Sequence, residues 1–529
     1  MTQKQVLGIV LTTAVTSLAL SWISNVNDTV INTDGILYVR AAAEIQAGDW
    51  TAAVATYNWP AFPACIAAWS SKTGLGLEAA ARQVGSGFDA IAAVAFLGLA
   101  YLLGARGRTL LFAAAAILLF PTVSKYRAYV IRDHGYVAGY LTAVCCLLAY
   151  SRQRRWVWAL GWGVAMVAAS LFRVEGLLFL VLVPFVFLLQ RGEPWRTRWL
   201  DLLRTSAVFL IGAIGLAVAW VTAEGSTAAR LASRSQIRHP IGYFKVLLET
   251  LTEGFPEKAE HVAEHVLHRD AEAYGPWIVL AAVGLIFCVE IVKALHPLYA
   301  CFVLHGRFSA RESWLDTDAP ARHERARGRR VWGAFVALNL ALLLVMAMLR
   351  FNLTGRAAVP LALTLLVWVP FSWNDLYVRW QSRRGLPFQY NFLFPLVAVL
   401  VLASGVAGAV RLGPSKTHIR AAGTWLEENL PAQAEVFTND FTLSFYAGRP
   451  QAPELRGLPW RKAVRTFEAA KKKKPKAPRA LAIRVKRKRP KEKAVVLERV
   501  GREPVHEFAS PRGDTVLVFS DSLGATPKN

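Results

Sequence analysis

Acidic residues stand close to aromatic residues at two places where the chain leaves an apolar stretch. Asp34 lies just after the first such stretch and one helical turn before Tyr38, and Asp133 lies just before Tyr136. A carboxylate at the mouth of a membrane-embedded cavity can accept a proton from an attacking hydroxyl group. Asp34 is therefore the first candidate for a general base and Asp133 the second. The alternative for Asp34 is an N-cap or turn residue before a helix that starts near Ile36.

Arginine residues accompany these acids and are suited to phosphate. Arg132 directly precedes Asp133, Arg173 and Glu175 lie between two apolar stretches, and Arg356 follows another. A guanidinium group binds phosphate oxygens through two parallel hydrogen bonds. Charges this near to hydrocarbon are unfavourable unless they are paired or functional. A structural ion pair is the alternative for Arg173 with Glu175 and for Arg132 with Asp133.

A group of histidines is a candidate metal site. His261, His265 and His268 follow one another at spacings that place their imidazoles on one face of a helix. A divalent metal ion is one ligand for such a face, and a plain amphipathic surface helix fits the same residues. The sequence indicates no other cofactor, because its cysteines lack the C-x-x-C spacing of thiolate sites.

The elements that must position these residues are membrane-spanning helices. Hydrophobic residues make up 54% of the 529 residues and the mean hydropathy is +0.33, which exceeds the values of soluble domains. The chain is therefore expected to be an all-α polytopic membrane protein. Apolar stretches predict about eleven transmembrane helices, near residues 6–23, 79–103, 109–123, 136–150, 156–172, 177–190, 205–222, 275–293, 331–349, 357–373 and 388–410.

The distribution of Lys and Arg between these stretches predicts the orientation, because positively charged loops stay in the cytoplasm. Arginines cluster in every second connection, at residues 106–108, 152–155, 191–198, 322–330 and 379–384. The N-terminus is then cytoplasmic and the first span is an uncleaved anchor. The connections that carry Asp34, Asp133, Glu175 and Arg356 face the outside.

The composition changes near residue 411, where the apolar stretches end. This divides the chain into a transmembrane module, 1–410, and a basic C-terminal domain, 411–529. Short helices and alternating strands predict a small α/β fold for this domain, outside the cytoplasm. Its Lys- and Arg-rich segment 471–493 resembles a nucleic-acid signal, but it lacks interleaved aromatic residues, so no nucleic-acid partner is expected. A solvated disordered loop, or a surface for anionic lipids or polymers, fits it better.

The motifs occur in an order that resembles a known family. They lie at residues 34–38, 57–63, 132–136, 173–176, 353–356, 425–431 and 445–449. This layout resembles the GT-C superfamily of integral-membrane glycosyltransferases, in the branch that contains protein mannosyltransferases, lipid A aminoarabinose transferases and their bacterial relatives. Gly35 stands where a second acid often follows the first, and Ala357 stands where Tyr often follows Arg. These two positions depart from the protein mannosyltransferase pattern.

The resemblance implies a GT-C fold and an inverting transferase in a bacterial inner membrane. Such an enzyme moves one sugar from a polyprenyl-phosphate carrier to a lipid, glycan or protein acceptor at the periplasmic face. The family's two acids correspond to Asp34 and Asp133. The chemistry of the neighbouring side chains adds candidates for substrate binding, namely Tyr38, Arg132, His134, Tyr136, Arg173, Glu175 and Arg356. A transporter or flippase for lipid-linked or anionic glycans is the alternative, although such proteins usually carry inverted repeats.

Overall fold

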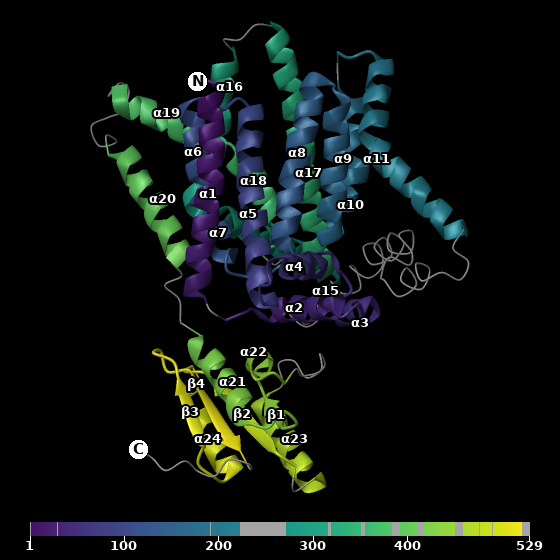
Figure 1. Ribbon diagram of the computed structural model, residues 1–529. Coiled ribbons are helices and arrows are strands. Elements are labelled where there is room, and N and C mark those ends of the chain that lie inside the picture. Colours follow the sequence, from purple (N-terminus) through teal and green to yellow (C-terminus); the bar gives the residue numbers. More distant parts are fainter. Residues whose placement is uncertain are drawn as a thin grey trace. The chain divides into compact units, whose positions relative to one another are not determined.

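The computed structural model describes most of the chain, mainly as helix with one small sheet near the C-terminal end (Figure 1). The described residues are 2–28, 30–190, 192–222, 271–315, 319–350, 355–382, 392–410, 416–449, 459–474, 477–488 and 490–520. The chain forms two compact units. Unit 1 comprises Met1–Trp22, Ala41–Arg127 and Ile131–Ala409, and unit 2 comprises Ile23–Arg40, Ala128–Val130 and Val410–Asn529.

Unit 1 is a helical bundle, and its first two helices continue into unit 2. In chain order the helices are α1 (Gln3–Asn27), α2 (Thr33–Gln46), α3 (Trp50–Thr56), α4 (Ala61–Thr73), α5 (Leu77–Leu102), α6 (Arg108–Leu118), α7 (Pro121–Tyr126), α8 (Asp133–Gln153), α9 (Trp156–Phe172), α10 (Glu175–Leu182), the 3-10 helix η1 (Val183–Leu189), α11 (Trp195–Thr222), α15 (Ala271–Leu295), α16 (Pro297–Leu315), α17 (Ala319–Arg350), α18 (Val359–Leu366), α19 (Val369–Ser382) and α20 (Leu393–Val410).

Several of these helices have the length and apolarity of membrane spans, so the chain is an integral membrane protein. Within the described residues five segments qualify: Gln3–Asn27, Leu77–Leu102, Arg108–Tyr126, Ala326–Met348 and Val359–Ser382. A sixth arises if α15 and α16, which meet at a bend of 88°, form one span. Other expected spans coincide with shorter apolar helices, Trp156–Phe172, Glu175–Leu189 and Phe394–Gly408. Because a hydrocarbon core takes about 20 helical residues to cross, the figure of about eleven spans stays a prediction.

Helix α1 directs polar side chains inward and apolar side chains outward. Thr13, Ser17 and Ser21 are at most 2% exposed and share one face. The exposed face carries Leu7, Leu11, Val15, Leu18, Trp22 and Val26. A soluble helix has the reverse arrangement, whereas small hydroxyl residues at a helix interface in lipid permit close approach and hydrogen bonding. The burial pattern of α1 therefore agrees with its assignment as a span.

Helix α8 lies at the centre of the bundle and packs against α5, α9 and α17. Tyr140 on α8 is fully buried, and its hydroxyl lies 3.1 Å from Thr364 Oγ1 and accepts a hydrogen bond of 2.7 Å from Asn339 Nδ2. Phe179 and Phe335 pack edge-on against its ring, at centroid distances of 5.3 and 5.7 Å. These contacts tie α8 to α10, α17 and α18, so the start of α8 has a defined position within unit 1.

An ion network joins three segments that the sequence assigns to one side of the membrane. Arg154, after α8, lies 2.9 Å from Glu193 and 3.2 Å from Asp201, both near the start of α11. Arg327 on α17 lies 3.2 Å from the other oxygen of Glu193. The basic connections around residues 154, 193 and 327 are thus held together within unit 1.

The C-terminal part of unit 2 is a small α/β fold with a four-stranded mixed sheet, as expected. Its elements are α21 (Thr417–Asn429), β1 (Glu435–Thr438), α22 (Phe441–Tyr446), α23 (Trp460–Lys473), β2 (Arg479–Val485), α24 (Pro490–Val500), β3 (His506–Ala509) and β4 (Thr515–Ser520). The strand order is β1-β2-β4-β3, with β1 parallel to β2 and the other pairs antiparallel. Register is defined by pairs such as Glu435 with Arg479 and Leu481 with Phe519.

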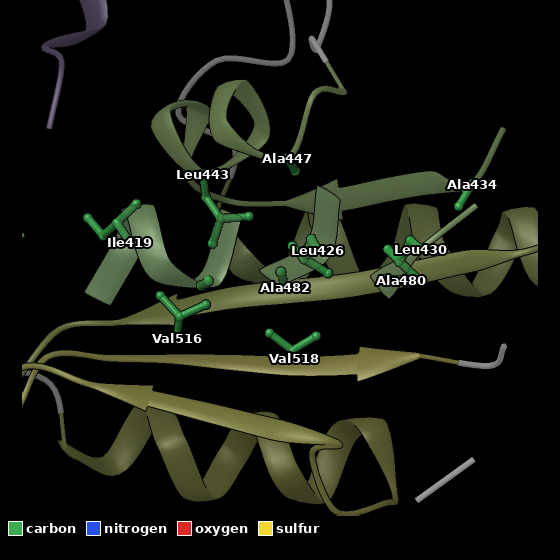
Figure 2. Close-up of a cluster of buried hydrophobic side chains, with 11 residues drawn as sticks. Ile419, Leu426, Leu430, Ala434, Leu443, Ala447, Ala480, Ala482, Val516 and Val518 are labelled. Carbon is green, nitrogen blue, oxygen red and sulfur yellow. The ribbon is translucent and has the colours of Figure 1, made fainter. Parts of the chain in front are cut away.

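Alternating side chains of β2 and β4 face two helical layers. On one side Ala482, Val516 and Val518 pack with residues of α21 and α22, including Ile419, Leu426 and Leu443 (Figure 2). On the other side Leu481, Ile483, Leu517 and Phe519 pack with Val464, Phe467 and Val496 of α23 and α24. Because side chains alternate between the two faces along a strand, these two sets of residues lie on opposite faces of the sheet. The domain therefore has three layers, with the sheet in the middle.

Two segments from the N-terminal half belong to unit 2, although their sequence lies within the predicted transmembrane module. The backbone N–H of Ile31 donates a hydrogen bond of 2.9 Å to the hydroxyl of Tyr446 on α22. The guanidinium of Arg40 lies over the ring of Phe441, 4.9 Å from its centroid. These contacts attach the segment that carries Asp34 to the C-terminal fold.

Candidate active site

Arg173 pairs with two acidic residues from different helices. It follows the end of α9 and forms ion pairs with Asp133, the first residue of α8, and with Glu175, the first residue of α10. The three side chains are 15–17% exposed. Burial lowers the pKa of a guanidinium, but the charges of Glu175 and Asp133 outweigh burial and raise the pKa of Arg173 above its usual value. Arg173 therefore stays a cation between two acids.

A pocket opens beside this ion pair. Its space amounts to about 260 Å³, including the part open to solvent. The Arg173 guanidinium lies 5.6 Å from the centroid of the Tyr136 ring, and both residues line the pocket. The full lining is Tyr136, Arg173, Glu175, Asn339, Leu342, Leu343, Met346, Ala357 and Pro360. One part of the wall is thus charged and another, from α17 and the start of α18, is apolar, which suits an amphiphilic ligand.

Arg356 lies in the turn before α18, directly before the pocket residue Ala357. A Cβ atom built on the preceding Gly355 would lie 3.8 Å from both Tyr126 Oη and Glu290 Oε2. Tyr126 interacts electrostatically with Arg356 and with Asp133. The structure thus brings the Arg356 turn and the ion pair of Arg173 to one region of unit 1.

Sequence reasoning missed two residues of this region, Tyr126 and Glu290. Glu290 lies on α15 and forms an ion pair of 2.7 Å with Lys293. An ionisable residue inside an apolar helix is a functional candidate by itself. That signal was present, because Glu290 interrupts the apolar run of α15.

His134 belongs to a different cluster and does not line the pocket. Its Nδ1 lies 2.7 Å from Asp89 Oδ1 on α5. Arg127 lies 3.9 Å from the other Asp89 oxygen and donates hydrogen bonds of 3.0 and 2.9 Å to the hydroxyls of Ser17 and Ser21 on α1. All five residues are less than 10% exposed. His134 therefore holds α8 in a buried polar network with α1 and α5, and Asp89 is a further residue that sequence reasoning missed.

Arg132 directly precedes α8. Its guanidinium lies 5.7 Å from the centroid of the Tyr57 ring, and its charge acts on Glu175. The motif around residues 57–63 and the motif around 132–136 thus meet in unit 1. Arg132 is half-buried and does not line the pocket.

Asp34 and Tyr38 lie in the part of α2 that belongs to unit 2, whereas Asp133 belongs to unit 1. Helix α2 begins at Thr33, so Asp34 lies within its first turn. It is half-buried, and Tyr38 is buried. The N-cap position therefore precedes Asp34. Asp34 is not the N-cap residue of α2, which was one of the two structural alternatives for this acid.

The start of α2 packs closely against residues 128–130. The side-chain amide of Asn32 accepts a hydrogen bond of 2.8 Å from the Val130 N–H and donates one of 3.1 Å to the Val130 carbonyl. A Cβ atom built on Gly35 would lie 2.8 Å from Val130 Cβ and from Ile31 Cγ1. A side chain at this position would have to displace Val130 or Ile31, which favours Gly35 where the family resemblance would place a second acid.

The histidines His261, His265 and His268 lie outside the described residues, so the possible divalent metal ion stays a prediction. Within the described part of the chain no group of three or more His, Cys, Asp or Glu side chains could hold a metal ion.

Comparisons of the sequence find no matching family model and no matching curated protein. Solved structures do match. The apo form of ArnT from Cupriavidus metallidurans aligns with 97% of this chain and 98% of its own, with a TM-score of 0.52 and 14% identity. The same protein bound to undecaprenyl phosphate aligns over 98% and 99%, with a TM-score of 0.50 and 14% identity.

An archaeal enzyme has a similar fold. The oligosaccharyltransferase of Archaeoglobus fulgidus, in its complex with zinc and sulfate, aligns with 96% of this chain and 72% of its own, with a TM-score of 0.51 and 14% identity. The chain has the GT-C fold. This confirms the fold class that the order of motifs indicated. The candidate residues lie between helices or close to their starts: Arg132, Arg173 and Arg356 lie between helices, Asp133 and Glu175 are the first residues of α8 and α10, and Asp34 lies in the first turn of α2.

Proposed function

We propose that the chain is an inverting glycosyltransferase that moves one sugar from a polyprenyl-phosphate carrier to an acceptor. The observation that carries the proposal is the meeting of Asp133, Arg173, Glu175 and the Arg356 turn beside one pocket of a GT-C fold. A solved structure with this fold, that of ArnT from Cupriavidus metallidurans, contains undecaprenyl phosphate. The acceptor is a lipid, glycan or protein at the periplasmic face of the cytoplasmic membrane.

The transfer needs a base and cations. A hydroxyl oxygen of the acceptor attacks the anomeric carbon of the sugar, and the bond between that carbon and the phosphate oxygen breaks. Asp34 accepts the hydroxyl proton as the new glycosidic bond forms. The leaving phosphate gains negative charge, which Arg132, Arg173 and Arg356 stabilise through charge-assisted hydrogen bonds. The proton thus moves to Asp34 and the phosphate leaves with the bonding electrons, so the transfer needs no redox partner.

Asp133 and Glu175 have a different role in this scheme. Both are paired with Arg173, so they orient that guanidinium and are themselves held in place. Asp133 then orients the acceptor, and Arg173 adds positive charge at the charged wall of the pocket.

The two kinds of wall in the pocket correspond to the two chemical parts of a polyprenyl-phosphate sugar. Leu342, Leu343 and Met346 supply an apolar surface for the first isoprene units, and Arg173 and Tyr136 supply a polar surface for the sugar phosphate. Cation–π and hydrogen-bonding groups beside an apolar wall are typical of sites for amphiphilic ligands.

Mass spectrometry of surface glycans tests the proposal in a strain that lacks the gene. We expect the loss of one sugar residue from a defined glycan and its return with the wild-type gene. With Asp34→Asn the protein should still accumulate and bind the donor, while transfer falls by on the order of 10² to 10⁴. Asp49→Asn is the matched control, because Asp49 caps α3 and asparagine caps equally well. Near-normal transfer by Asp34→Asn would remove Asp34 as the base.

A further inference from the structure

Asn339 is a polar residue near the middle of an apolar helix of membrane-spanning length. It lies on α17 within the span Ala326–Met348. Its side chain is 3% exposed, and it lines the pocket beside Arg173 on the same stripe of α17 as Leu342 and Met346. An amide group at this depth in hydrocarbon is unfavourable unless its hydrogen-bonding atoms have partners. The partners of each Asn339 atom therefore indicate what the residue does.

Both hydrogens of the Asn339 amide are donated to protein atoms. Nδ2 lies 2.7 Å from the backbone carbonyl oxygen of Phe335 and 2.7 Å from the hydroxyl oxygen of Tyr140. A carbonyl oxygen can only accept a hydrogen bond, so the amide atom beside Phe335 must be the nitrogen. Phe335 lies on α17 itself, one turn before Asn339. The orientation of the amide is therefore fixed by its own helix and does not depend on Tyr140.

The hydroxyl groups beyond the amide form a chain of hydrogen bonds with one direction. Thr364 Oγ1 donates a hydrogen bond of 2.7 Å to the Pro360 carbonyl, so it accepts the hydroxyl hydrogen of Tyr140, whose oxygen is 3.1 Å away. The Tyr140 oxygen in turn accepts a hydrogen bond from Asn339 Nδ2. The chain therefore starts at the Asn339 amide and ends at a backbone carbonyl of α18. None of its hydrogens is left to bond Asn339 Oδ1.

The remaining polar atom, Asn339 Oδ1, reaches the pocket. It accepts no hydrogen bond from the described residues, and it is not among the atoms that are sealed from solvent without a partner. Because Asn339 is buried except where it lines the pocket, the accessible part of this oxygen lies in the pocket. The hydroxyl of Tyr136, a pocket residue that is also 3% exposed, likewise has no hydrogen-bond partner among the described residues. The pocket thus offers a ligand an acceptor oxygen and a hydroxyl group.

We propose that Asn339 determines the specificity of the donor site by accepting a hydrogen bond from a hydroxyl group of the sugar. This inference rests on the proposed function, because it takes the pocket as the donor site. A sugar hydroxyl can donate to Oδ1, whereas the phosphate oxygens of the donor only accept and its isoprene chain has no hydrogen-bond donor. The sugar is therefore the part of the donor that Asn339 can bind. A sugar without a hydroxyl at this position leaves a buried acceptor unpaired, which disfavours its binding.

Binding measurements with two lipids test the role of Asn339 in the purified full-length protein. The lipids are undecaprenyl phosphate and undecaprenyl phosphate that carries the sugar missing from the deletion strain. Asn339→Leu removes Oδ1 with little change in volume, so the Kd for the sugar-bearing lipid should rise by about 3- to 10-fold. The Kd for undecaprenyl phosphate should stay the same. Asn339→Ala should change the ratio of the two Kd values in the same direction, which shows that the loss does not come from a clash with the leucine side chain.

Tyr140→Phe is the matched control for a purely structural role of the amide. It removes the hydrogen bond between α17 and α8 but leaves Asn339 held by the Phe335 carbonyl, so the ratio of the two Kd values should stay at its wild-type value. A ratio that is unchanged in Asn339→Leu, or that changes equally in Tyr140→Phe, would overturn the inference. A change in the KM for the acceptor alone would also overturn it, because the hydroxyl would then belong to the acceptor. Wild-type protein that binds neither lipid would instead contradict the proposed function.

Discussion

Asp89 Oδ1 on α5 lies 2.7 Å from His134 Nδ1 on α8, in a cluster that also contains the buried guanidinium of Arg127. His134 directly follows Asp133, which pairs with Arg173. The contact between Asp89 and His134 therefore fixes the first turn of α8 and, with it, the acid that the proposed mechanism uses. Because α5 and α8 run side by side through the bundle, helix packing and the position of this acid are coupled.

Asp89→Asn should destabilise the folded protein. The substitution keeps the shape of the side chain but leaves Arg127 buried with no anionic partner in this cluster. Removing one partner of a buried ion pair costs about 3–5 kcal/mol. The free energy of unfolding in detergent micelles, measured by titration with SDS, gives this difference. Ser21→Ala is the control, since it removes a hydroxyl that accepts a hydrogen bond from Arg127 but keeps both charges, and it should cost less, about 1.5–3 kcal/mol. Equal effects of the two variants would show that the charge of Asp89 is unimportant.

Arg356→Ala should weaken binding of a polyprenyl-phosphate donor. A hydrogen bond to a charged group contributes about 1.5–3 kcal/mol, so the loss should be about 10- to 100-fold in affinity. Calorimetry with purified protein and polyprenyl phosphate measures it. Arg379→Ala is the matched control, because Arg379 lies on the exposed surface of α19 in a pair with Asp375. Unchanged affinity after Arg356→Ala would place the phosphate elsewhere.

The predicted orientation is tested by reporter fusions. A reporter fused after residue 325 should be cytoplasmic, because it follows the basic connection that shares an ion network with the connections around residues 154 and 193. A reporter fused after residue 450 should be periplasmic. Alkaline phosphatase should therefore be active only at the second position and a green fluorescent protein only at the first. The same sidedness at both positions contradicts the orientation and the outward-facing site.

The C-terminal domain should lose stability in acid through Asp514. Its carboxylate accepts a hydrogen bond of 2.8 Å from the Arg487 N–H and lies 3.5 Å from Arg484. The Arg487 hydrogen bond, with the charge of Arg484, lowers the pKa of Asp514 below its usual value of 3.8. A lowered pKa means that the stabilisation is complete above the usual value and is lost as the pH falls through the folded-state pKa.

Hydrogen exchange of β4 amides measures this loss. After correction for intrinsic exchange rates, protection should decrease between about pH 5 and about pH 3. Asp514→Asn should lower protection at the higher pH and flatten the dependence. Glu498→Gln, on the exposed surface of α24, should leave the curve unchanged. A curve for Asp514→Asn that still follows the wild type would assign the acid sensitivity to another carboxylate.

The sequence by itself determined the class of the protein, the small α/β fold at the C-terminus and the GT-C arrangement of motifs. These features depend on local signals. Hydropathy over a helical length identifies spans, alternation identifies strands such as β4, and charged residues at the ends of apolar stretches identify loops. The ion pair of Arg173 with Glu175 was also foreseeable from the sequence, because both residues lie within one short connection.

Only the tertiary structure decided the partners of these residues. Asp133 is paired with Arg173, and His134 with Asp89, because α5, α8 and α9 pack side by side. Glu290 is close to the Gly355 turn, far away in sequence. Such contacts depend on the rotation and register of whole helices, which small packing differences along their full length set. No local pattern of residues contains that information, so the sequence could supply the candidates but not their arrangement.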